Sequence, residues 1–119
     1  MNDPIEQEIQ AKGLTAPRVT PADVEANIAK EVYFTAADGI GGRNAFHDEP
    51  MQTVNTEHTL LTFCVLTLRN GFTVTGESAC ASPENFDAEI GRKIARANAV
   101  NKVWPLMGYA LRNKLSEAA

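Results

Sequence analysis

The residues best suited to chemistry lie in the polar segment 76–87 and in the two turns that follow it. An apolar, β-prone stretch ends there and an amphipathic one begins, so we expect a strand-to-helix junction. Backbone amides without partners in the first turn of a helix favour an anion. Neutral hydrogen-bonding groups and a basic run accompany them, namely Ser78, Ser82, Asn85, Arg92, Lys93 and Arg96. This pattern favours a site for a small anionic ligand.

Acidic residues in the same region favour a simpler interpretation. Glu84, Asp87 and Glu89 can complement the helix dipole and pair with basic neighbours. A well-capped surface helix with salt-bridged flanks is therefore the alternative to a ligand site. The sequence leaves both interpretations open.

Residues that often carry catalytic or metal chemistry have no useful spacing in this sequence. His47, His58, Cys64 and Cys80 match neither Cys-x-x-Cys nor His-Glu-x-x-His, and there is no Gly-x-Ser-x-Gly motif. The glycine-rich segment 39–42 lacks the Lys-Ser/Thr ending of a phosphate loop, so we interpret it as a flexible hinge. We therefore expect a protein that is not an enzyme and needs no metal or other cofactor.

Composition narrows the class of protein further. The 119 residues carry 11 Lys and Arg against 15 Asp and Glu, a formal net charge of −4. Non-specific nucleic-acid binding needs a basic surface, so we exclude it. No apolar run reaches the roughly 20 residues of a membrane helix, and the acidic N-terminus does not resemble a secretory signal. Two cysteines are too few for a disulfide framework, so we expect both to be reduced.

The first half of the chain predicts two helices and a long loop. Residues 1–19 form an N-terminal arm, with a short helix over 1–12. Thr20 is a good N-cap and proline follows it, so a second helix is expected over 21–32. Residues 39–57 show no periodicity and are rich in Gly, Asn, Asp and Pro, which predicts a surface loop.

The middle of the chain predicts a β-hairpin. Segments 59–68 and 72–79 are β-prone, and Asn70-Gly71 between them is typical of a two-residue type I′ turn. With that turn, Thr67 would pair with Val74, and every other pair would follow from this register.

The first hairpin strand, 59–68, is apolar on both faces, whereas the second is not. A central strand covered on two sides explains the difference, with Tyr33-Phe34-Thr35 as a third strand. The second cover would be another helix of this chain or another subunit. We therefore expect a homo-oligomer, most simply a dimer.

A long helix is predicted over 83–103, with Ser82 as its cap. Trp104-Pro105 predicts its end, before a final helix that stops near Ser116. We expect one apolar stripe of the long helix to pack on the hairpin: Phe86, Ile90, Ile94, Ala97, Val100 and Trp104. The resulting fold is α+β, a single domain over 20–116 with a small antiparallel sheet and helices at both ends.

Residues 70–109 resemble an uncharacterised family of tailed-phage proteins, named after gene 49 of one phage and gene 66 of another. The residues that carry the resemblance read NGFTVTGESACASPENFDAEIGRKIARANAV, followed by KVWPLMGY, and upstream VTPADVEANIAKEVYFTAADG also fits. The resemblance extends over residues 19–112. It implies a small, soluble, non-structural phage product in the cytoplasm of an infected bacterium, and it brings no catalytic motif.

Several small phage proteins are oligomeric sponges for the nucleotide messengers of bacterial immunity, the Thoeris anti-defence type among them. By analogy, we expect this protein to sequester a cyclic oligonucleotide or a molecule of the cyclic ADP-ribose type. The candidate contacts are Ser78, Asn85, Arg92, Lys93 and Arg96, with Phe34 or Phe72 as a stacking surface. The alternative is a protein-binding inhibitor or modulator of a host enzyme, which uses the acidic surface or the 39–57 loop.

Overall fold

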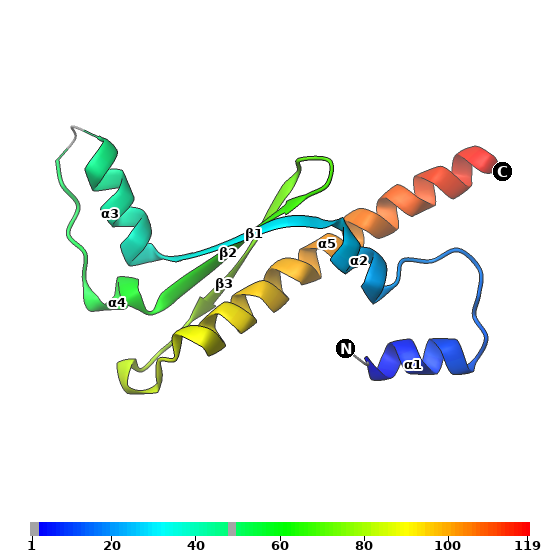
Figure 1. The fold of residues 1–119 in the computed structure, drawn as a ribbon, viewed down its shortest axis with the longest axis horizontal. Coiled ribbons are helices and arrows are strands. Elements are labelled where there is room, and N and C mark those ends of the chain that lie inside the picture. The colour runs from blue at the N-terminus through cyan, green and yellow to red at the C-terminus, as the bar shows by residue number, and fades with distance from the viewer. Residues whose placement is uncertain (1–2, 48–49) are drawn as a thin grey trace.

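The structure, a computed structural model, describes residues 3–47 and 50–119. The molecule is elongated, with principal extents of 57 × 33 × 18 Å. A sheet and one long helix form two layers at its centre, and shorter helices lie toward both ends (Figure 1).

The central sheet has three antiparallel strands in the order in which they occur in the chain. They are β1 (Ile28–Thr35), β2 (Leu61–Leu68) and β3 (Thr73–Ala79). Helix α5 (Ala88–Ala118) crosses one face of the sheet and extends well beyond it (Figure 1). The predicted α+β fold is confirmed, with β2 as the central strand. The strand predicted to join the hairpin, which contains Phe34, is β1.

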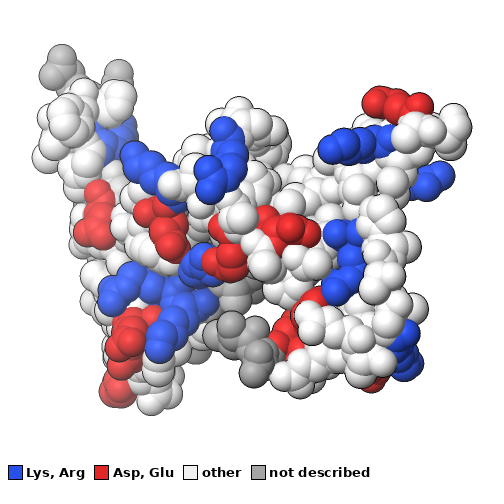
Figure 2. All heavy atoms as spheres, turned by 45° about the vertical axis from the view of Figure 1, so that its right-hand side comes forward, with Lys and Arg blue, Asp and Glu red and all other residues white. Residues whose placement is uncertain are grey.

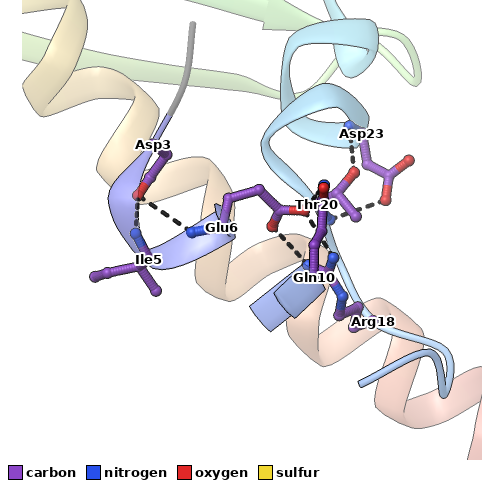
Figure 3. Close-up of polar contacts among 7 residues, drawn as sticks. All are labelled: Asp3, Ile5, Glu6, Gln10, Arg18, Thr20 and Asp23. Atoms are coloured by element: carbon purple, nitrogen blue, oxygen red, sulfur yellow. Dashed lines mark hydrogen bonds and ion pairs between the residues drawn. The ribbon is translucent and has the colours of Figure 1, made fainter. Parts of the chain in front are cut away.

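The N-terminal arm contains the expected short helix, α1 (Pro4–Ala11). Asp3 caps it by accepting a hydrogen bond from the Ile5 amide at 2.8 Å. Arg18 donates two hydrogen bonds to Glu6, each 2.7 Å long, and so ties the linker back to α1 (Figure 3). These bonds lower the pKa of Glu6 to about 2.

The second helix begins where it was predicted but ends earlier. Thr20 and Asp23 cap α2 (Pro21–Asn27) reciprocally, as Figure 3 shows. The predicted helix over 21–32 is wrong beyond Asn27, because the chain enters β1 there and pairs with β2. Residues from 28 onward are rich in β-branched and aromatic types, which gain more from cross-strand packing than from another helical turn.

The predicted loop over 39–57 is also wrong in part. Most of its first half belongs to α3 (Ala36–Phe46), and α4 (Thr56–Thr59) leads into β2. Thr35 and Asp38 form a reciprocal cap, with hydrogen bonds of 3.1 and 2.9 Å. Such a cap satisfies amides of the first turn and offsets the poor helix propensity of the glycines that follow.

The hairpin exists, but its turn differs from the prediction. Residues 69–72 lie between β2 and β3, and Gly71 alone among them has a positive φ, of 90°. The Leu68 amide donates to the carbonyl oxygen of Phe72 at 2.8 Å and closes the loop. A type I′ turn would need a positive φ at Asn70 as well as at Gly71. A positive φ costs a residue with a side chain more strain than it costs glycine.

The extra loop residue shifts the register by one position relative to the prediction. Thr67 pairs with Thr73 instead of Val74, and Cys64 pairs with Gly76. A shift of one residue moves every side chain of a strand to the other face. Val74 and Gly76 therefore face α5, whereas the predicted register would have placed them on the opposite face of the sheet.

The predicted apolar stripe of the long helix is wrong in its first half, whereas Val100 and Trp104 pack against the core as predicted. Ile90 and Ile94 are 56% and 47% exposed. The buried residues are instead small ones, spaced four apart: Gly91, Ala95, Ala99 and Val103. A Cβ at Gly76 would lie 2.1 Å from the carbonyl oxygen of Ala95. The backbones of β3 and α5 are therefore in direct contact where the two elements cross. Only a helix face of small residues permits that approach.

The ends of the long helix also differ from the prediction of 83–103. Residues 83–85 form a short 3₁₀ turn, η1 (Pro83–Asn85), and Asp87 caps α5 through the Ile90 amide at 2.9 Å. The helix then continues through Pro105 to Ala118. Residues 101 and 105 are exposed, so water can bond the carbonyl that proline leaves without a donor.

Candidate functional site

A small recess lies where the end of β1 meets the starts of α3 and α5. Its volume is about 110 Å³. Aromatic, hydroxyl and charged side chains line it together: Tyr33, Phe34, Thr35, Asp38, Thr62, Phe86, Ala88 and Arg92. Two residues of the predicted ligand site, Phe34 and Arg92, thus meet in one place although they are distant in the sequence. An aromatic ring next to a guanidinium suits a ligand that combines a base with phosphate.

Phe34 is positioned by the register of the sheet. It pairs with Phe63 of the central strand, and the two ring centroids are 5.6 Å apart with planes tilted by 33°. By strand alternation both residues belong to the face turned away from α5. Phe34 is also near the end of β1 and is one of the residues that line the recess.

Arg92 is positioned by the close approach of α5 to β2. A Cβ at the preceding residue, Gly91, would lie 3.1 Å from Thr62 Oγ1, which shows how closely the helix start approaches the strand. Arg92 itself is exposed. No carboxylate within residues 3–47 and 50–119 lies at ion-pair distance from it. Its charge therefore remains available to a ligand.

Arg96, another predicted contact, has a structural role instead. Its Nη2 lies 2.8 Å from Glu25 Oε1 on α2, and its Nε lies 2.8 Å from Glu31 Oε2 on β1. The bond to Arg96 lowers the pKa of Glu25, and bonds from Tyr33 and then Arg96 lower the pKa of Glu31. Both carboxylates in turn raise the pKa of Arg96. We conclude that Arg96 joins three elements and is already neutralised.

The structure does not bring the other predicted contacts to the recess. Lys93 pairs with Glu89 at 3.3 Å on the exposed flank of α5, as expected from their spacing. Ser78 is half-buried near the end of β3, and Asn85 is exposed in η1. Phe72 lies at the hairpin end of the sheet, which is the end opposite to the start of α5.

The start of α5 is less suited to binding an anion than the sequence indicated. The turn η1 is only three residues long. In the first turn of α5, the carboxylate of Asp87 already accepts a hydrogen bond from the Ile90 amide. A carboxylate at this position takes the place that an anionic ligand would occupy.

Several residues of the recess were missed by sequence reasoning. The Thr35-x-x-Asp38 pattern is a capping signature and could have located the start of α3. Phe86 was assigned to the apolar stripe of the helix. Nothing in the sequence distinguishes Tyr33 or Thr62 as lining residues, because their place depends on the packing of distant segments.

The two cysteines lie in different environments. Cys64 is fully buried beneath α5, and burial raises the pKa of its thiol. Cys80 is half-buried, and its Sγ lies 3.2 Å from the carbonyl oxygen of Ser82. No group of three or more His, Cys, Asp or Glu side chains in the described residues could hold a metal ion.

Three hollows lined by described residues are larger than the recess. Two, of about 540 and 450 Å³, follow the linker after α1, and the third, of about 470 Å³, lies between α2 and the second half of α5. Acidic and basic side chains lie intermixed over the face shown in Figure 2. Among the described helices, none is long and apolar enough to cross a membrane.

Comparison with known protein families assigns the chain. Residues 19–115 match the phage protein (N4 Gp49/phage Sf6 gene 66) family. The chain belongs to this family. The family match contains the sheet, the recess and nearly all of α5, and it leaves out α1. No curated protein and no solved structure matches the chain.

Proposed function

We propose that this phage protein binds and sequesters a nucleotide-derived immune signalling molecule of the cyclic oligonucleotide or cyclic ADP-ribose type. It acts as an anti-defence sponge in the cytoplasm of the infected bacterium, without catalysis. The observation that carries the proposal is the recess in which Phe34 and Arg92 lie together.

The recess supplies three kinds of contact that such a ligand needs. Phe86, with Phe34 at the same recess, offers apolar surface to a base. Arg92 offers a planar, permanently charged donor to a phosphate. Asp38 opposes phosphate, but its carboxylate can accept hydrogen bonds from ribose hydroxyls or an amino group of the base.

The size of the recess indicates how the ligand would be enclosed. About 110 Å³ is well below the roughly 300–1,000 Å³ of an ordinary ligand pocket. The recess therefore accommodates only part of a nucleotide-derived molecule, and tight sequestration needs a second wall. A homo-oligomer, most simply a dimer, supplies that wall from another copy of the chain.

Calorimetric titration with a panel of cyclic oligonucleotides and ADP-ribose isomers tests the proposal. The wild-type chain should bind at least one of them. Arg92→Ala should weaken that binding by about tenfold to a hundredfold, because one charge-assisted hydrogen-bonding group is lost. Phe34→Ala should weaken it by a similar amount through lost stacking.

Lys102→Ala is the matched control, since Lys102 is an exposed cation of the same helix outside the recess. It should bind as the wild type does, and all variants should keep the wild-type circular dichroism.

Mass spectrometry of the titrated ligand should recover the ligand chemically unchanged, whereas turnover of the ligand would reveal an enzyme. Absence of binding across the panel, or full affinity of Arg92→Ala, would refute the assigned site.

A second function is favoured by a different observation. Helix α5 exposes large apolar side chains on surfaces that no described element covers: Ile90, Ile94, Leu106 and Tyr109. Neighbouring exposed apolar groups often mark a protein-binding surface, and Ile90 and Ile94 lie one helical turn apart. If the protein is an inhibitor or modulator of a host enzyme, pull-down from host lysate should yield one stoichiometric partner. That partner should be retained by Arg92→Ala and lost by Ile94→Lys.

A further inference from the structure

One face of the sheet, here called the open face, has no cover in the described part of the chain. Along β2 every second residue is buried under α5, and the residues between them are only half-buried. The centre of the open face consists of Val32, Phe34, Leu61, Phe63 and Val65. Helices α3 and α4 lie beyond the end of the sheet and not across this face (Figure 1).

The chemistry of the open face is unusual for a surface exposed to water. An antiparallel sheet with one solvated face normally alternates apolar residues inside with polar residues outside. Here the central strand is apolar on both sides, and Val32 on the neighbouring strand is 42% exposed. Polar side chains are confined to the margin, where Thr67 and Thr75 lie. An apolar centre with a polar rim is the composition of a protein interface.

The molecule also exposes more surface than is expected for a compact monomer of the same mass. Its accessible surface is 8378 Å², against about 6,300 Å² expected for a folded chain of 12.9 kDa. Its radius of gyration is 18.5 Å, against about 13.5 Å for a compact chain of this length. Part of the excess belongs to α1 and the projecting end of α5, and part to the open face. The whole excess of accessible surface is larger than the roughly 800 Å² that each partner buries in a standard interface.

The charges on the open face are arranged so that the face can complement itself. Lys30 lies on β1 opposite Thr67, near the hairpin end, and Glu77 lies on β3 opposite Phe63, near the other end. The two charges thus occupy diagonally opposite corners. A two-fold axis along the other diagonal exchanges these corners, and it makes the strands of two copies cross at a steep angle.

We propose that the open face is the interface of a homodimer in which two copies pack sheet to sheet. Lys30 of each copy then faces Glu77 of the partner subunit, and the apolar centres form a shared core. The inference goes beyond the proposed ligand, because it concerns the protein alone. It bears on ligand enclosure nonetheless, since Phe34 borders both the open face and the recess.

Sedimentation velocity of the full chain without ligand tests the proposal. The wild type should sediment as a dimer at micromolar concentration. Val65→Lys should sediment as a monomer with unchanged circular dichroism, because its side chain lies on the uncovered face. Thr75→Lys, at a position already exposed, provides a second variant that does not endanger folding. A monomeric wild type, or lysine variants that dimerise as the wild type does, would overturn the interface.

A charge-exchange cycle tests the crossing geometry. Lys30→Glu and Glu77→Lys should each weaken the dimer by about tenfold, because each replaces two attractive pairs with repulsive ones. The double variant should recover most of the wild-type affinity. Exchange at Lys102 and Glu84, exposed charges outside the open face, should have no effect. A double variant no better than the single ones would contradict the assigned pairing.

Discussion

At the residue scale, the fold depends on the absence of a side chain at Gly76. A Cβ there would lie 2.1 Å from Ala95 O and 2.3 Å from Ala99 N, both backbone atoms of the helix. We predict that Gly76→Ala lowers the free energy of unfolding by about 2–3 kcal/mol, because α5 must move off the sheet. Chemical denaturation followed by circular dichroism measures the change.

Gly108→Ala is the matched control on the same helix. Nothing lies within 4 Å of a Cβ at that position, so alanine should raise stability by up to about 1 kcal/mol through helix propensity. Equal effects of the two substitutions would contradict the close crossing of β3 and α5.

The buried thiol gives a second prediction at this scale. Cys64 is 0% exposed and its pKa is raised by burial, so little thiolate forms and no reagent reaches it. In a Cys80→Ser background, maleimide labelling should be slow in native buffer and complete in denaturant. Rapid labelling of the native chain would show that β2 and α5 separate readily.

At the element scale, Arg96 is the contact that joins α2, β1 and α5. The pKa values of Glu25 and Glu31 lie below their usual range in the folded chain. Each carboxylate thus binds its proton less tightly when folded, so stability is present above about pH 5 and is lost as the pH falls through the folded pKa. We predict that Arg96→Met is less stable than the wild type at neutral pH, and that the difference shrinks toward about pH 3. Urea denaturation at several pH values measures it, and a pH-independent difference would assign Arg96 a packing role only.

Much at this scale could be predicted from local chemistry. The cap at Thr20, the presence of a hairpin and the presence of a long helix follow from residue type and spacing alone. The errors arose where distant contacts decide. The stretch after Asn27 fits a helix or a strand by pattern, and pairing with β2 selects the strand. The turn at Asn70 fits two hairpin types, and the need to place Gly76 under α5 favours the longer one.

The candidate site could be predicted only in part for the same reason. Phe34 and Arg92 were recognised by their chemistry, and the fold brings them together. The sequence could not show that Arg96 is neutralised, because its two carboxylates come from α2 and β1. It also could not show that Phe72 lies at the far end of the sheet, which follows from the strand order.

At the scale of the whole molecule, the apolar surface exceeds what one chain covers. The small-residue face of α5 packs on the sheet, and this leaves Ile90 and Ile94 outside and the open face of the sheet bare. The recess is likewise too small to enclose a nucleotide-derived ligand alone. We propose one explanation for both features, namely that the chain works as an assembly of several copies.

Native mass spectrometry of the protein purified from infected host cells tests the central claim most directly, because it reports subunit number and bound small molecule together. The account predicts a dimer or a higher even-numbered oligomer that carries a co-purified species of nucleotide mass. Mild collisional activation should release that species intact. A bare monomer from the same cells would contradict the proposed binding and the proposed interface alike.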